Sequence, residues 1–197
     1  MNGSQPADTF PRLLLHHAAA RGEQPAMREK DLGIWQTWSW GQVRDEVCAL
    51  ACGLAELGFK RGDNLAILGD NRPRLYCAMA AAQCLGGVTV PMYQDAVALE
   101  LLFVLQDAEI KFAIVEDQEQ ADKLLEVKAQ CPQLAHIMYD EPRGMRHYNQ
   151  HFLPGLDGIL QMGRAHMRDH PEFLDAEIAL GAPEDVAIIL YTSGTTG

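Results

Sequence analysis

The sequence is poor in basic residues. Its 197 residues contain 16 Lys and Arg against 27 Asp and Glu, which gives a formal net charge of −11. A general nucleic-acid surface needs clustered Lys and Arg, so we expect no nucleic-acid partner. Hydrophobic residues make up 48% and charged residues 22%, which is typical of a globular protein that can bury a core without disulfides or metals.

The sequence also lacks a disulfide framework, a signal peptide and a long apolar run. No Cys-x-x-Cys pair occurs among its five cysteines, which are Cys48, Cys52, Cys77, Cys84 and Cys131. An odd number without framework spacing predicts reduced thiols, and core packing is favoured over a metal site for Cys48 and Cys52. Residues 1–10 have no apolar signal core, and no apolar stretch approaches the roughly 18 residues of a membrane span. We expect a cytoplasmic protein, with peripheral contact at the inner face of a membrane left open.

Strand and helix signals alternate through the middle of the chain. A helix from Thr9 to Gly22, a strand region over 26–40 and a helix behind the capping box of Ser39 and Gln42 come first. The expected strands that follow are 64–68, 88–90 (stopped by Pro91), 112–115 and 135–138, and the expected helices are 72–85, 97–106 and 118–130. Such alternation predicts an α/β fold with a mostly parallel sheet flanked by helices.

The chain changes character after residue 139. Residues 140–184 hold four prolines and several glycines and predict an irregular connection, with one helix over 156–167. Residues 186–190 are apolar and predict a buried strand, which leads into a loop. We therefore divide one continuous portion, 1–197, into an α/β subdomain (9–139), this connection (140–184) and a strand plus loop (185–197).

The loop after that strand is the strongest candidate site. It comprises Thr192, Ser193, Gly194, Thr195, Thr196 and Gly197. Glycines let the backbone approach a ligand, and successive N–H groups with hydroxyls can surround anionic oxygens. It is neither a Walker motif nor Gly-x-Gly-x-x-Gly, and taken alone it is as well explained by a simple turn. Because several Ser and Thr hydroxyls follow directly after an expected buried strand, a phosphate-binding loop is favoured over a simple turn.

Other polar groups have simpler explanations. We expect Asp70 or Asn71 to cap the helix that follows. The run from Glu116 to Glu119 is interpreted as a solvated helix start. The histidine pairs 147/151 and 166/170 have metal-ligand spacing but lie in a Pro/Gly-rich segment, so surface or linker histidines are favoured.

Three stretches together resemble the adenylate-forming superfamily of acyl-CoA synthetases, adenylation domains and luciferases. Residues 191–197 match the first half of its phosphate-loop motif, residues 83–91 match its Gly-Gly-x-x-x-Pro segment, and residues 37–40 stand at its early strand-to-helix signature. Residues 69–73, Gly-Asp-Asn-Arg-Pro, and 91–93, Pro-Met-Tyr, are similar to segments of bacterial long-chain fatty acyl-CoA synthetases.

The resemblance implies a two-step ligase that uses ATP, Mg²⁺, a fatty acid and coenzyme A. It implies that residues 192–197 hold the ATP phosphates, that Thr195 meets the magnesium ion, and that relatives form homodimers through N-terminal parts. The family's metal carboxylate, ribose contact and adenylation lysine stand in motifs that this sequence does not contain. We therefore expect no catalytic residue in this chain, no C-terminal domain and no activity of the chain alone.

Rival functions stay open from the sequence. One is adenylation of an aromatic, short-chain or amino acid. A second is a non-catalytic nucleotide-binding α/β module, and a third is an interaction role such as dimerisation through the N-terminal helix and the tryptophan-bearing strand region.

Overall fold

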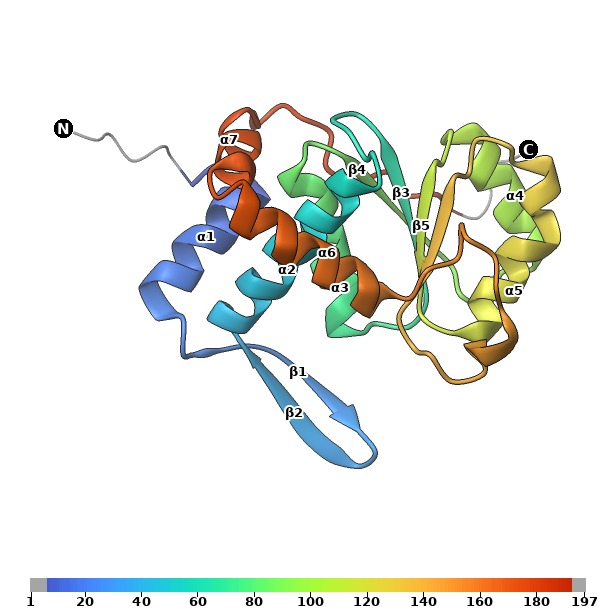
Figure 1. The fold of residues 1–197 in the computed structure, drawn as a ribbon, viewed down its shortest axis with the longest axis horizontal. Coiled ribbons are helices and arrows are strands. Elements are labelled where there is room, and N and C mark those ends of the chain that lie inside the picture. Colours follow the sequence, from blue (N-terminus) through green and yellow to red (C-terminus); the bar gives the residue numbers. More distant parts are fainter. Residues whose placement is uncertain (1–6, 193–197) are drawn as a thin grey trace.

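The computed structural model describes residues 7–192, in which a four-stranded parallel sheet is the central element (Figure 1). Its strand order is β4-β3-β5-β6, and each neighbouring pair is parallel. The strands are β3 (Asn64–Leu68), β4 (Val88–Met92), β5 (Phe112–Val115) and β6 (His136–Tyr139). A separate antiparallel hairpin consists of β1 (Pro25–Asp31) and β2 (Ile34–Ser39).

Helices connect and cover these strands. They are α1 (Phe10–Arg21), α2 (Trp40–Glu56), α3 (Pro73–Cys84), α4 (Ala98–Asp107), α5 (Gln118–Val127), α6 (Leu156–Asp169) and α7 (Phe173–Ala179), with 3-10 turns η1 (Lys128–Gln130) and η2 (Met145–His147). The predicted capping box is present, because the Ser39 side chain accepts from the Gln42 amide and the Gln42 side chain accepts from the Ser39 amide. The α/β fold with a parallel sheet flanked by helices is confirmed. No helix in the described range is both long and apolar enough to span a bilayer.

The two faces of the sheet bury two separate cores. Successive side chains of a strand point to opposite faces. Leu65 and Ile67 accordingly pack with α2, α3 and α6, whereas Ala66 and Leu68 pack with α4 and α5. Figure 1 shows these two helical layers on either side of the sheet. All five cysteines are free and buried, as core packing predicts for Cys48 and Cys52.

The α2–α6 contact is unusually close. A Cβ atom built on Gly163 would lie 1.7 Å from the carbonyl oxygen of Ala49, and one on Gly53 would lie 2.3 Å from that of Ile159. Real Cβ atoms do not approach backbone oxygens at these distances. The two glycines therefore allow the helix backbones to touch.

Two expectations about local structure are wrong. Pro91 does not end the strand, because β4 continues to Met92. β4 is an edge strand of the named sheet, where the missing proline N–H removes no ladder bond. The stretch 140–184 is also more ordered than expected, because α7 follows the predicted helix α6. The apolar residues of α7, Leu174 and Ile178, are buried in the core beside α2. This burial stabilises a short helix that the local sequence alone does not indicate.

Candidate functional site

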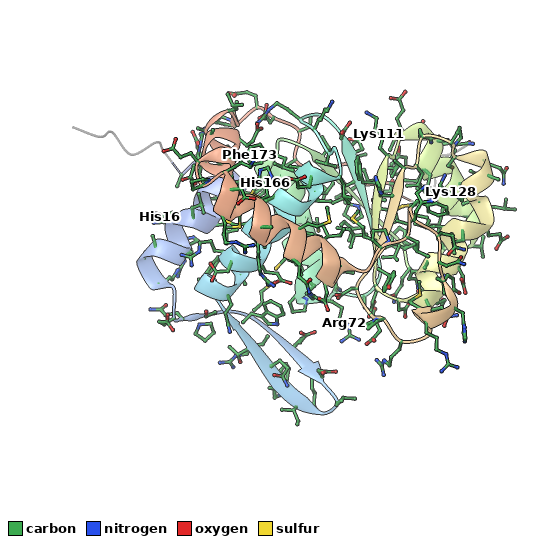
Figure 2. All side chains as sticks on the ribbon, viewed as in Figure 1. His16, Arg72, Lys111, Lys128, His166 and Phe173 are labelled. Carbon is green, nitrogen blue, oxygen red and sulfur yellow. The ribbon has the colours of Figure 1, made fainter. Side chains whose placement is uncertain are left out.

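The polar loops at the carboxyl edge of the sheet form the candidate site. Open α/β sheets bind ligands at the carboxyl ends of their strands. In Figure 2, Arg72, which follows β3, marks this edge, and Lys111, which precedes β5, marks the opposite edge. The loops that meet here begin at Gly69, Tyr93, Glu116 and Asp140.

A cavity of about 420 Å³ lies between the loops that follow β3 and β4. Ile67, Leu75 and Met79 give it apolar walls, and Asn71 and Tyr76 stand at its polar side. The Tyr76 hydroxyl donates to Asn71 Oδ1 at 2.8 Å. Its lining includes Asp70 and Asp95 but neither Lys nor Arg, so the cavity itself suits an uncharged part of a ligand better than a phosphate.

Arg72 and Glu116 join the loops after β3 and β5. Arg72 Nε donates to Glu116 Oε1 at 2.9 Å, and the amide of Asp70 donates to Glu116 Oε2 at 2.6 Å. The hydrogen bond to Glu116 raises the pKa of Arg72 against a smaller opposing effect of burial. Gly69 is required for this approach, since a Cβ atom there would lie 2.5 Å from Cβ of Glu116. The loop after β3 is thus held by side-chain hydrogen bonds rather than by the helix cap.

This arrangement corrects two expectations. The N-cap of α3 is Arg72, with no side-chain cap bond, so neither Asp70 nor Asn71 caps the helix. The Asn71 side-chain oxygen accepts from the Tyr76 hydroxyl instead of from a helix amide, and the Asp70 amide donates to Glu116. Glu116 is not a solvated helix start either, because its side chain is only 15% exposed. Asp117 does cap α5, accepting from the Gln120 amide.

Arg74 holds a second charged cluster beside this edge. Its guanidinium donates to Glu46 on α2 at 2.9 Å, to Asp140 after β6 at 2.5 Å and to Asp157 on α6 at 2.6 Å. Burial opposes the charge on Arg74, but these three carboxylates outweigh it and raise the pKa of Arg74. Burial raises the pKa of Asp140 despite its bond to Arg74. One side chain therefore ties α2, α3, α6 and the end of β6 together.

The two arginines at the start of α3 indicate these charged clusters in the sequence, although they belong to no motif. Arg72 and Arg74 flank Pro73 at the start of α3. A helix N-terminus carries partial positive charge, so cations there are unfavourable unless carboxylates compensate them. Two arginines at a helix start therefore indicate acidic partners elsewhere, although not which ones.

The segment that leads to the predicted loop lies beside β4. Thr89 and Ile188 form a parallel bridge, in which the Thr89 amide donates to Ala187 O at 3.2 Å and the Ile189 amide to Thr89 O at 2.9 Å. At this bridge the segment runs parallel to β4. The buried strand expected over 186–190 is wrong, because the structure has only this bridge and Val186 and Leu190 are more than 60% exposed.

Tyr191 anchors the end of this segment. Its hydroxyl donates to Asp107 Oδ2 at 2.5 Å, and its ring meets the edge of Phe103 on α4. Burial, followed by the bond to Asp107, raises the pKa of Tyr191 to about 12. Of the predicted loop, Thr192 is exposed, and Ser193, Gly194, Thr195, Thr196 and Gly197 lie outside the described residues.

Of the histidines with metal-ligand spacing, His147, His151 and His170 are exposed as expected, whereas His166 has partners in the fold. His166 on α6 lies 2.6 Å from Glu56, and its ring contacts those of His170 and Phe173, as Figure 2 shows for the labelled pair His166 and Phe173. Its side chain is 13% exposed, so it is more buried than a linker histidine. Across residues 7–192 no three His, Cys, Asp or Glu side chains are grouped to hold a metal ion.

Comparison with known proteins gives one family match. The model of a family described as AMP-binding enzyme matches residues 14–197. A long-chain-fatty-acid–CoA ligase, ACSBG2 of Xenopus laevis, is 30% identical over 196 residues, covering 98% of this chain and 26% of the relative. Another, FadD15 of Mycobacterium tuberculosis, is 28% identical over 165 residues, covering 84% and 26%. The chain thus spans about a quarter of the length of these relatives.

Solved structures share the fold at low identity. The N-terminal domain of FACL13 from Mycobacterium tuberculosis superposes with a TM-score of 0.70 and 24% identity, covering 93% of this chain and 41% of that one. The anthranilate CoA ligase AuaEII superposes with a TM-score of 0.67 and 18% identity, covering 77% and 27%. At this identity the superpositions establish a common fold.

Proposed function

Because the chain belongs to the AMP-binding enzyme family, we propose that the protein containing it is a long-chain fatty acid–CoA ligase. In the proposed first step a fatty carboxylate attacks the α-phosphorus of ATP, forming acyl-adenylate and releasing pyrophosphate. In the second, the thiol of coenzyme A attacks the acyl carbonyl, loses its proton and displaces AMP. The names of the similar ligases support the choice of long-chain acids.

The parallel bridge between Thr89 and Ile188 carries the structural part of this proposal. It holds the segment before residues 192–197 beside β4, the strand whose following loop lines the cavity beside Tyr76. A loop of N–H and hydroxyl groups after this segment would hold the ATP phosphates, as donors placed where charge develops stabilise a transition state. Magnesium, held in part by Thr195, would neutralise charge on the leaving pyrophosphate.

The test uses the full-length protein and measures pyrophosphate release with acids from medium to long chain. We expect release only with ATP, Mg²⁺ and a long-chain acid. Thr195→Ala is expected to lower kcat by about a hundredfold, in the range known for losing one such donor, and Thr195→Ser to restore most of it. Thr37→Ala, an exposed threonine on β2, is the matched control and should leave kcat unchanged.

The rival functions predict different results in this assay and in two companion measurements, ATP binding and acyl-CoA formation. Release with aromatic, short-chain or amino acids alone would replace the long-chain proposal with another adenylation. ATP binding in calorimetry, with no release for any acid, would indicate a non-catalytic module. Acyl-CoA formation by the 197 residues alone would contradict the expectation that catalysis needs the rest of the protein.

A further inference from the structure

The turn of the β1–β2 hairpin places a leucine where leucine is unfavourable. Leu32 and Gly33 connect the strands, and both have positive φ, 46° and 82°. Such turns favour Asn-Gly or Gly-Gly, since a bulky side chain adopts positive φ only at a cost. The Leu32 side chain is also 88% exposed. Neither backbone preference nor packing in the described structure explains a leucine here.

The neighbours of Leu32 extend an apolar tip. Ile34 is 65% exposed and Trp35 66% exposed, directly after the turn. Figure 1 shows the hairpin projecting from the body, with its turn as the farthest point. Leu32 before Gly33, and Ile34 and Trp35 after it, thus give three large apolar side chains that stand outside both cores.

The charges of the hairpin are sorted between its two faces. Arg28 is paired with Thr37 and Lys30 with Trp35, so these side chains share the outer face. Within residues 7–192 the side chains of Arg28 and Lys30 make no hydrogen bond or ion pair, although the chain has an excess of acids. The outer face therefore offers two unpaired cations and an indole.

The carboxylates of the hairpin lie on its other face. Glu29 accepts from Trp38 Nε1 at 3.3 Å and stands 3.9 Å from Arg72, on the side of the body. Asp31 is paired with Ile34 and shares that face. The outer face is thus free of carboxylates.

We propose that this tip and outer face dock on an anionic lipid surface. Indole and aliphatic side chains partition into the membrane interface, and nearby Lys and Arg are attracted by anionic headgroups. A net charge of −11 opposes general attraction to such a surface, so a local cationic face is needed. A second copy is the poorer partner, since a symmetric contact between outer faces would bring like charges together. The proposal rests on the hairpin and not on the proposed reaction.

The experiment measures co-sedimentation of the full-length protein with vesicles of phosphatidylcholine alone or mixed equally with phosphatidylglycerol. Leu32→Asn suits the turn better, so folding should be retained while the partition coefficient falls about tenfold, the loss expected for one partly buried leucine. Replacing Arg28 and Lys30 by Gln should lower binding to the mixed vesicles about fivefold per charge and leave binding to phosphatidylcholine unchanged.

Leu99→Asn on α4 is the matched control, because Leu99 is 68% exposed but lies away from the hairpin. It should bind vesicles as wild type does. Quenching of tryptophan fluorescence by brominated lipid should decrease in Trp35→Phe. Equal binding of Leu32→Asn and wild type, or no vesicle binding by wild type, would overturn the proposal. A fall in oligomeric mass on Leu32→Asn, with vesicle binding unchanged, would assign the tip to self-association instead.

Discussion

Two apolar regions of this molecule have opposite environments. At the α2–α6 crossing, Gly53 and Gly163 bring backbones into contact, and Val47, Leu50 and Leu54 on α2 are fully or almost fully buried. In the segment beside β4, Val186 and Leu190 are mostly exposed, and the segment is joined to β4 by a single bridge of backbone hydrogen bonds. Apolar composition alone thus does not determine burial. A stretch of apolar residues is buried only where another element of the fold packs against it. The predictions below test this contrast, from the largest expected effect to the smallest.

Gly163→Ala should give the largest effect. Its Cβ would meet the backbone of Ala49, which can yield only if α2 and α6 separate, so we expect a loss of about 3 kcal/mol in the free energy of unfolding. Gly158→Ala, in the same helix with open space around it, should stabilise by about 0.5–1 kcal/mol. Urea unfolding of both variants measures these changes. Equal changes in the free energy of unfolding for the two variants would show that α2 and α6 are not in close contact.

Arg74→Gln should come second. It removes the shared partner of Glu46, Asp140 and Asp157, so we expect a loss of about 2 kcal/mol at neutral pH, below the usual value for a fully buried pair because Arg74 is 24% exposed. The loss should shrink as pH falls, since the unpaired carboxylates then protonate. Arg44→Gln, which removes an exposed pair with Asp45, should change stability by less than about 0.5 kcal/mol. A loss for Arg74→Gln that is independent of pH would contradict the electrostatic explanation.

The thiols of the same core predict an alkaline loss of stability. Burial raises the pKa of Cys48 and Cys77 to about 12, from 9.0. Because the unfolded thiols ionise first, stability should be present below about pH 9 and decrease as pH rises from 9 toward 12. Replacing both cysteines by Ala should make the urea midpoint fall less steeply in this window. An unchanged slope would mean that other groups cause the loss.

The exposed segment should give the smallest change in stability. Ile188→Thr alters a side chain that is 38% exposed, so we expect a change below about 0.5 kcal/mol in urea unfolding of the 197-residue chain. The Ile189 amide should exchange hydrogen through local opening, about a hundredfold faster than the amides of β3, which is paired on both sides. Protection of Ile189 equal to that of β3 would show that the segment belongs to the same cooperative unit as the sheet.

Local patterns were sufficient to predict most of the fold. The capping box at Ser39, the strand Phe112–Val115 and the strand Asn64–Leu68 all stand where the sequence predicts them, because caps and alternating elements depend on near neighbours. The failures involve distant partners. The helix α7 depends on packing against the core, and the apolar stretch 186–190 is buried on one side only, with Ile189 packed against the core and Val186 and Leu190 exposed.

The candidate site was predictable only in part. Hydroxyls and glycines in sequence order indicate a phosphate loop, but the ties of Arg72 to Glu116 and of Arg74 to Asp140 join residues 44 and 66 positions apart. No local pattern specifies which carboxylate an arginine will reach. The role of residues 193–197 stays a prediction that the kinetics of Thr195→Ala can test.

The close α2–α6 contact also has a consequence for synthesis on the ribosome. Helix α2 ends at Glu56, whereas α6 is complete only at Asp169. At the usual pace of translation, α6 is synthesised on the order of ten seconds after α2. During that interval the apolar surface of α2 that will contact Gly163 is uncovered in the nascent chain, so a chaperone has time to bind this surface before α6 emerges.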